Sequence, residues 1–152
     1  MDWIRILRGS LVGLDTAPII YYVEANPHYL PTIDPFFDAL AQGDFETVTS
    51  MISLLESLVH PIRTGDVVLA DRYRSFLLNT AGITTLPVAQ SIAELAAELR
   101  ATYTVRTPDA IQLATAIHSG ASYFVTNDGR LPALPGLSIV VLDAVISGAW
   151  TA

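Results

Sequence analysis

The residues best placed for chemistry are carboxylates that follow short apolar segments. The apolar run LVGL ends at Asp15, and the run YFVTN ends at Asp128. Asp109 stands at the expected start of a helix, just after Thr107 and Pro108, and Glu56 lies within another expected helix. Each acid alone has an ordinary explanation, because aspartates commonly cap helices and stabilise turns. If the four side chains converge in the fold, they would share one pocket.

Four carboxylates in one pocket would need a positive partner, because like charges at close range strongly disfavour joint ionisation. The chain offers no lysine for this, since all of its 8 basic residues are arginine. A divalent cation resolves the repulsion, and carboxylate-rich sites select hard ions such as Mg²⁺ or Mn²⁺. Such an ion activates water for an in-line displacement at phosphorus. Thr16, Thr126 and Asn127 adjoin the aspartates and are candidate supporting residues that hydrogen-bond the carboxylates or a bound water.

Short apolar strands alternate with helices along the whole chain. Strands are expected at Leu11–Leu14, Phe45–Ser50, Ile83–Val88, Tyr123–Thr126 and Ser138–Leu142. Helices are expected at Ile19–Val23, Pro31–Ala41, Met51–Val59, Asp66–Asn79, Ser91–Thr102 and Thr107–His118. This alternation predicts an α/β fold with three α/β/α layers around a mostly parallel sheet, in a single domain over 1–152. Ligands of such folds gather at the carboxyl ends of the strands, where Asp15 and Asp128 are expected.

Two helices carry the other acids. The helix that holds Glu56 is expected to end before Pro61, and its buried stripe is expected to be Ile52, Leu55, Leu58 and Val59. Glu56 then falls at the edge of that stripe, beside a polar face. In the later helix, Thr107 is the expected N-cap and Asp109 lies in the first turn.

Composition excludes several classes of function. The chain has 152 residues, of which 51% are hydrophobic and 15% charged, so it can bury a core and is not intrinsically disordered. The absence of lysine removes Schiff-base and P-loop chemistry. The absence of cysteine removes disulfides, thiolate nucleophiles and cysteine-ligated metals. With a net charge of -7, the chain is also a poor candidate for a purely electrostatic nucleic-acid binder.

The sequence does not favour a membrane or exported protein. A spanning helix needs about 20 consecutive apolar residues. The nearest candidate, Leu137–Trp150, is shorter and contains Asp143. The apolar segment after Arg5 and Arg8 is too short for a signal peptide. A cytoplasmic protein without a membrane partner is therefore expected.

Four motifs in a fixed order carry a resemblance to a known family. They are LDTAPIIYYVE, SLLESL, TPDAIQLATAI and YFVTNDGRL. Together they resemble the PIN-domain ribonucleases, most of all the small single-domain toxins of the VapC type. The resemblance implies that Asp15, Glu56, Asp109 and Asp128 are catalytic and ligate magnesium or manganese. Family members often carry a further acid or aromatic residue after the last motif, where this chain has Gly129-Arg130-Leu131.

The resemblance also implies an activity and its partners. The expected function is Mg²⁺- or Mn²⁺-dependent endoribonuclease, with one or two ions, that hydrolyses RNA and leaves a 5′-phosphate and a 3′-hydroxyl. The protein is then expected to be the toxin of a type II toxin–antitoxin pair, with a small antitoxin partner and a homodimeric state.

Other interpretations remain at this point. A phosphoaspartate hydrolase is disfavoured, because Asp15-Thr16-Ala17 is not a D-x-D motif and the usual lysine is missing. A receiver-type domain lacks the same lysine. A catalytically silent PIN-like binding or regulatory module is the main alternative. Five arginines are candidates for phosphate contacts, and the sequence assigns none of them: Arg63, Arg72, Arg74, Arg106 and Arg130.

Overall fold

A single sheet of five parallel strands forms the centre of the molecule. The computed structural model describes residues 2–152. The strands are β1 (Leu11–Leu14), β2 (Glu46–Ser50), β3 (Ile83–Leu86), β4 (Tyr123–Thr126) and β5 (Ser138–Val141). Their order across the sheet is β3-β2-β1-β4-β5, and every neighbouring pair is parallel. The α/β class and the parallel sheet predicted from the sequence are therefore confirmed.

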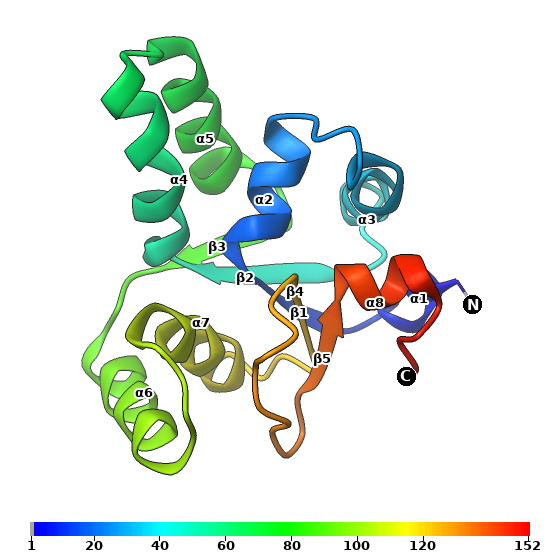
Figure 1. The fold of residues 1–152 in the computed structure, drawn as a ribbon, viewed down its shortest axis with the longest axis vertical. Coiled ribbons are helices and arrows are strands. Elements are labelled where there is room, and N and C mark those ends of the chain that lie inside the picture. Colours follow the sequence, from blue (N-terminus) through cyan, green and yellow to red (C-terminus); the bar gives the residue numbers. More distant parts are fainter. Residues whose placement is uncertain (1) are drawn as a thin grey trace.

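Helices cover both faces of this sheet (Figure 1). In chain order they are α1 (Trp3–Ile6), α2 (Thr16–Val23), α3 (Leu30–Ala41), α4 (Met51–Thr64), α5 (Val67–Asn79), α6 (Gln90–Thr102), α7 (Thr107–His118) and α8 (Leu142–Ser147). Helices α6 and α7 lie below the sheet in the view of Figure 1, and the others lie above it. The predicted three layers are thus present. Within residues 2–152, no helix has the length and apolar character needed to cross a membrane.

Two separate apolar cores hold the layers together. Side chains alternate between the faces of a strand, so neighbours in one strand enter different cores. In β4, Phe124 joins the core beneath α6 and α7, whereas Val125 joins the core under α1, α2, α3 and α5. In β1, Val12 and Leu14 enter the second of these cores, and both are fully buried. The central strands are therefore covered on both faces, as parallel sheets require.

The parallel arrangement brings the ends of distant strands together. Leu14 pairs with Val125, so β1 and β4 end side by side. The backbone N–H of Asp15 continues this ladder by donating to the carbonyl of Val125 at 2.9 Å. The turns that follow β1 and β4 thus start from the same edge of the sheet, where the expected ligand site lies.

The helix that carries Glu56 differs from its prediction in length. It continues to Thr64, and Pro61 lies inside it. Proline costs a helix one backbone hydrogen bond. The buried side chain of Pro61 and the packing of α4 along α5 compensate for this loss. The helix ends instead at Gly65, whose φ of 72° places it in the left-handed region that favours glycine.

The buried face of α4 also differs from its prediction. Ser53, Ser57 and Pro61 are the buried residues, whereas Leu55 and Val59 of the predicted apolar stripe are 59% and 43% exposed. The two serines can be buried because their hydroxyls are hydrogen-bonded, Ser57 to the carbonyl of Ser53 and Ser53 to neighbouring polar side chains. Of the predicted stripe, Ile52 and Leu58 are half-buried.

The start of α7 lies one residue earlier than predicted. Arg106 is the N-cap residue, and Thr107 is already the first helical residue. The extended backbone of Arg106, with ψ of 157°, sets this boundary, and no side chain caps the helix. Asp109 still lies in the first turn, as expected.

The close approach of β1 to α7 predicts the effect of a small substitution. A Cβ atom at Gly13 would lie 2.7 Å from Cβ of Ala116 and 2.8 Å from Cδ1 of Phe124. Gly13→Ala is therefore expected to lower the free energy of unfolding by about 1–3 kcal/mol through overpacking. Urea denaturation measures this change. Gly129→Ala is the control, since a Cβ there meets nothing within 4 Å, and equal stability losses in both variants would contradict the packing argument.

Candidate functional site

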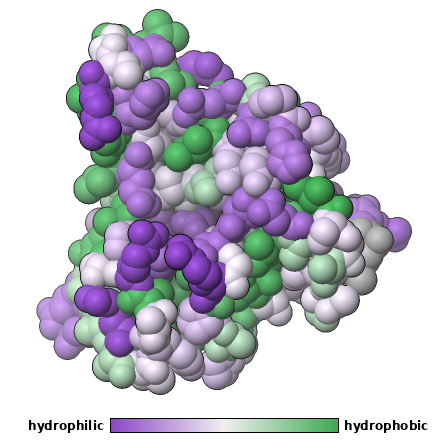
Figure 2. Space-filling model, in the orientation of Figure 1, coloured by the Kyte–Doolittle hydropathy of each residue, from purple (hydrophilic) through white to green (hydrophobic). Residues whose placement is uncertain are grey.

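An open cavity of about 640 Å³ lies where the turns after β1 and β4 meet α4 and α7. All four predicted carboxylates, of Asp15, Glu56, Asp109 and Asp128, line it. They come from four segments: the N-cap of α2, the middle of α4, the first turn of α7 and the turn after β4. Hydrophilic surface gathers around the hollow between the helical layers on this face of the molecule (Figure 2). We call this cavity the acidic pocket.

Asp15 is the most deeply placed of the four carboxylates. Its Oδ1 accepts a hydrogen bond from the backbone N–H of Thr16 at 2.8 Å, and its Oδ2 accepts one from Oγ1 of Thr126 at 2.7 Å. Burial raises the pKa of Asp15, and the negative charges of Asp109 and Glu56 raise it further, while the two hydrogen bonds act in the opposite direction. The carboxylate of Asp15 is therefore partly removed from water and lies near other negatively charged side chains.

Two threonines occupy the supporting positions expected from the sequence. Thr126 donates to Asp15, and Oγ1 of Thr16 donates to Oε1 of Glu56 at 2.7 Å. Asn127 behaves differently although it lines the same cavity. Its Nδ2 donates to the hydroxyls of Tyr21 and Tyr29 at 3.1 and 3.0 Å, and its Oδ1 accepts from the backbone N–H of Asp143. In the structure Asn127 thus joins the turn after β4 to α2 and α8.

A buried polar network supports the floor of the pocket. Gln112 on α7 is 2% exposed, and its Nε2 donates to Oγ of Ser53 at 2.6 Å. Ser53 in turn lies 3.1 Å from Oγ1 of Thr16 and 2.9 Å from Oγ1 of Thr49. This network links α7 and α4 to the threonine that holds Glu56. Sequence reasoning missed Gln112 and Ser53, because buried polar residues within an apolar helix pattern give no signal of their partners.

The other two carboxylates are paired with arginines. Nε of Arg106 lies 3.2 Å from Oδ2 of Asp109, and Nε of Arg130 lies 3.0 Å from Oδ1 of Asp128. Arg130 also donates through Nη2 to the second oxygen of Asp128 at 3.2 Å. These hydrogen bonds lower the pKa of Asp128. Both guanidinium groups are largely exposed, at 74% and 83%, so each can leave its carboxylate at small cost.

The donor set of the pocket suits a hard divalent cation. Its four carboxylates offer only oxygen ligands, which Mg²⁺ and Mn²⁺ prefer. Asp109 and Glu56 are close enough to Asp15 to raise its pKa. Among residues 2–152, however, no three His, Asp or Glu side chains stand in a ready-made metal geometry. Arg106 contacts only Oδ2 of Asp109, whereas Arg130 contacts both oxygens of Asp128.

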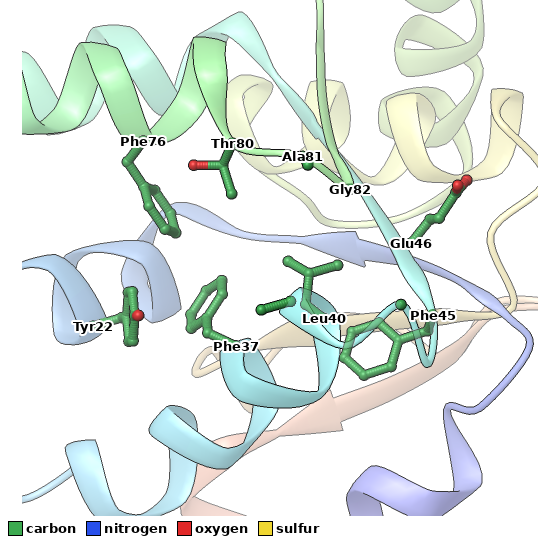
Figure 3. Close-up of a pocket in the computed structure, with 11 residues that line it drawn as sticks. Tyr22, Phe37, Leu40, Phe45, Glu46, Phe76, Thr80, Ala81 and Gly82 are labelled. Atoms are coloured by element: carbon green, nitrogen blue, oxygen red, sulfur yellow. The ribbon is translucent and has the colours of Figure 1, made fainter.

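A second cavity, of about 440 Å³, lies at the opposite edge of the sheet (Figure 3). The amino ends of β2 and β3 border it, and the rings of Tyr22, Phe37 and Phe76 point into it. Glu46 is the one carboxylate of its lining. This cavity lacks the converging charged groups that hydrolytic chemistry needs, so the acidic pocket is the candidate site.

The raised pKa of Asp15 predicts a pH-dependent gain in stability for Asp15→Asn. A carboxyl whose folded-state pKa lies above its unfolded value stabilises the fold when protonated and loses that contribution as pH rises through the folded pKa. At neutral pH without divalent ions, Asp15→Asn should therefore unfold at a higher temperature than the parent. The difference should shrink as pH falls through the folded pKa of Asp15. Thermal unfolding followed by circular dichroism across pH tests this, and a variant less stable than the parent at neutral pH would contradict it.

Comparisons with known proteins identify the family and the fold of the chain. The chain matches the PIN domain family over residues 12–137. The toxin–antitoxin complex from Klebsiella pneumoniae contains a chain that is 24% identical, with a TM-score of 0.64, covering 88% of this chain and 98% of that one. No curated protein matches the chain significantly.

Two further solved structures share the fold. VapBC2 from Rickettsia felis, bound to a DNA fragment from its promoter, contains a chain that is 18% identical, with a TM-score of 0.68 and coverage of 86% and 98% of the two chains. VapC20 from Mycobacterium tuberculosis, a sarcin–ricin loop cleaving toxin, is 18% identical, with a TM-score of 0.63 and coverage of 80% and 92%. The match spans most of the sequence and the fold is the same, so this chain belongs to the PIN domain family.

Proposed function

We propose that the protein is a metal-dependent endoribonuclease whose active site is the acidic pocket. One observation carries this proposal: carboxylates from four distant segments line one cavity at the carboxyl edge of the sheet. A purely structural use of these acids, as helix caps or turn residues, gives no reason for them to converge. The identity of the family supports the same conclusion.

In this proposal Asp15, Glu56, Asp109 and Asp128 hold one or two Mg²⁺ or Mn²⁺ ions. A bound ion would supply an activated water and would neutralise charge on the phosphate. The hydroxyls of Thr126 and Thr16 fix the orientation of Asp15 and Glu56, because each donates a bond of 2.7 Å to its carboxylate. Hydrolysis by a water molecule needs no nucleophilic side chain. This fits the sequence, which contains neither cysteine nor lysine. The products would carry a 5′-phosphate and a 3′-hydroxyl.

The same proposal includes protein partners. The similar structures include toxin–antitoxin complexes, so we propose that this chain is the toxin of such a pair and that a small antitoxin blocks its site. A homodimer belongs to the same expectation. Exposed apolar side chains on α4 and α5, namely Leu55, Val59, Ile62, Val67 and Val68, offer surface for such contacts. A sedimentation mass equal to one 16.4 kDa chain would contradict the homodimer.

Metal-dependent cleavage is the direct prediction of this function. Purified protein incubated with total RNA and Mn²⁺ should create discrete new 5′ ends, which sequencing maps. Asp109→Asn should lower the cleavage rate about a hundredfold or more, because it removes a negative charge from the site.

The matched control is Asp71→Asn. Asp71 also pairs with an arginine one helical turn away, but it lies outside the acidic pocket. This variant should cleave like the parent. Equal cutting by the parent and Asp109→Asn would refute the assignment of Asp109. No cutting by any of the proteins would favour the alternative of a catalytically silent PIN-like module.

A further inference from the structure

We propose that Arg100, Arg106 and Arg130 form a subsite for a phosphate of single-stranded RNA beside the acidic pocket. This inference rests on the proposed function, since it names how the substrate is held there. The three side chains line a cavity of about 520 Å³ that we call the arginine pocket. The two cavities adjoin, because both are lined by Arg106, Arg130, Asp109 and Asp128.

The gathering of arginines is notable in a chain with so few cations. Only 8 basic residues oppose 15 acids, and three of those 8 line this one cavity. Other arginines are used elsewhere: Arg72 donates to the carbonyl of Val23, Arg74 pairs with Asp71, and Arg8 pairs with Asp44. Arg63 lines a different, mostly apolar cavity. Of the five candidates from the sequence, Arg106 and Arg130 therefore line the arginine pocket, and the structure adds Arg100 to them.

The geometry of the three side chains suits a phosphate. Arg130 already binds both oxygens of Asp128 through Nε and Nη2, and the same fork matches two oxygens of a phosphate. Nε of Arg100 donates to the carbonyl of Val105 at 3.1 Å, which orients this guanidinium. Its terminal nitrogens take no part in that bond and can donate to a ligand. The exposed positions of Arg106 and Arg130 let them turn from their aspartates to a ligand.

Electrostatics explains why such a subsite is needed. A net charge of -7 and a pocket of carboxylates repel RNA. A cation in the acidic pocket would take over Asp109 and Asp128, which frees Arg106 and Arg130 for the substrate. A phosphate next to the reacting one would then meet three positive charges. A single strand fits this arrangement better than a duplex, since its backbone can follow two adjoining cavities.

Salt-dependent RNA binding tests this inference without relying on cleavage. Fluorescence anisotropy would measure the affinity of a short labelled single-stranded RNA in Ca²⁺, with gels to check that the RNA stays intact. The logarithm of the binding constant falls linearly with the logarithm of the salt concentration. For single strands, each phosphate that is no longer contacted makes this slope shallower by about 0.7. The triple variant R100Q/R106Q/R130Q loses the contacts to this one phosphate, so its slope should be about 0.7 shallower than the parent slope, and it should bind about tenfold more weakly.

Two control variants make the test specific. R5Q/R63Q/R74Q removes the same charge from other surfaces and should keep the parent slope. R100K/R106K/R130K keeps the charge and should retain the slope even though it loses the bidentate geometry. An unchanged slope in R100Q/R106Q/R130Q, an equal loss in R5Q/R63Q/R74Q, or equal affinity of the parent for duplex and single-stranded RNA would each overturn the subsite.

The outcome is separable from that of the proposed function. A parent protein that shows the predicted slope but never cleaves RNA would refute the nuclease and leave the subsite standing. A protein that cleaves RNA while R100Q/R106Q/R130Q keeps the parent slope would refute the subsite alone.

Discussion

Repulsion among converging carboxylates is the constraint on which the rest of this structure depends. Four acids share one pocket, and the chain has no lysine to offset them. Each acid instead has a specific partner. Asp15 and Glu56 accept hydrogen bonds from threonine hydroxyls, whereas Asp109 and Asp128 pair with exposed arginines. Burial raises the pKa of Asp15, and the charges of Asp109 and Glu56 raise it further; a divalent cation would offset that repulsion.

The fold creates this constraint because a parallel sheet places the ends of distant strands at one edge. Asp15 and Asp128 are far apart in sequence, yet β1 and β4 pair directly and end together. The network of Gln112, Ser53 and Thr16 then ties α7 and α4 to the same edge. The packed layers and the polar network thus together hold the four mutually repelling carboxylates at one edge of the sheet.

Much of the fold could be predicted from the sequence, because apolar strands and amphipathic helices have clear periods. The orientation of α4 could not: its apolar stripe has the right period, but buried hydroxyls of Ser53 and Ser57 face the protein and Leu55 faces solvent. The candidate acids could be selected by their motifs, whereas their arginine partners could not. Asp109 and Arg106 are close in sequence, but only the folded structure shows that both border two adjoining cavities. The short helices α1 and α8 have too few residues for a periodic pattern.

Binding of Mn²⁺ to the purified protein tests the central claim most directly. Isothermal titration at neutral pH would compare the parent with Asp15→Asn, which keeps the shape of the side chain, and with the Asp71→Asn control. We expect the parent and the control to bind Mn²⁺ alike and Asp15→Asn to lose about 10–100-fold in affinity. The parent affinity should also fall as pH is lowered, since protonated carboxylates cannot serve as ligands. A parent that shows no binding at millimolar Mn²⁺, or binding that Asp15→Asn leaves unchanged, would contradict a metal site in the acidic pocket.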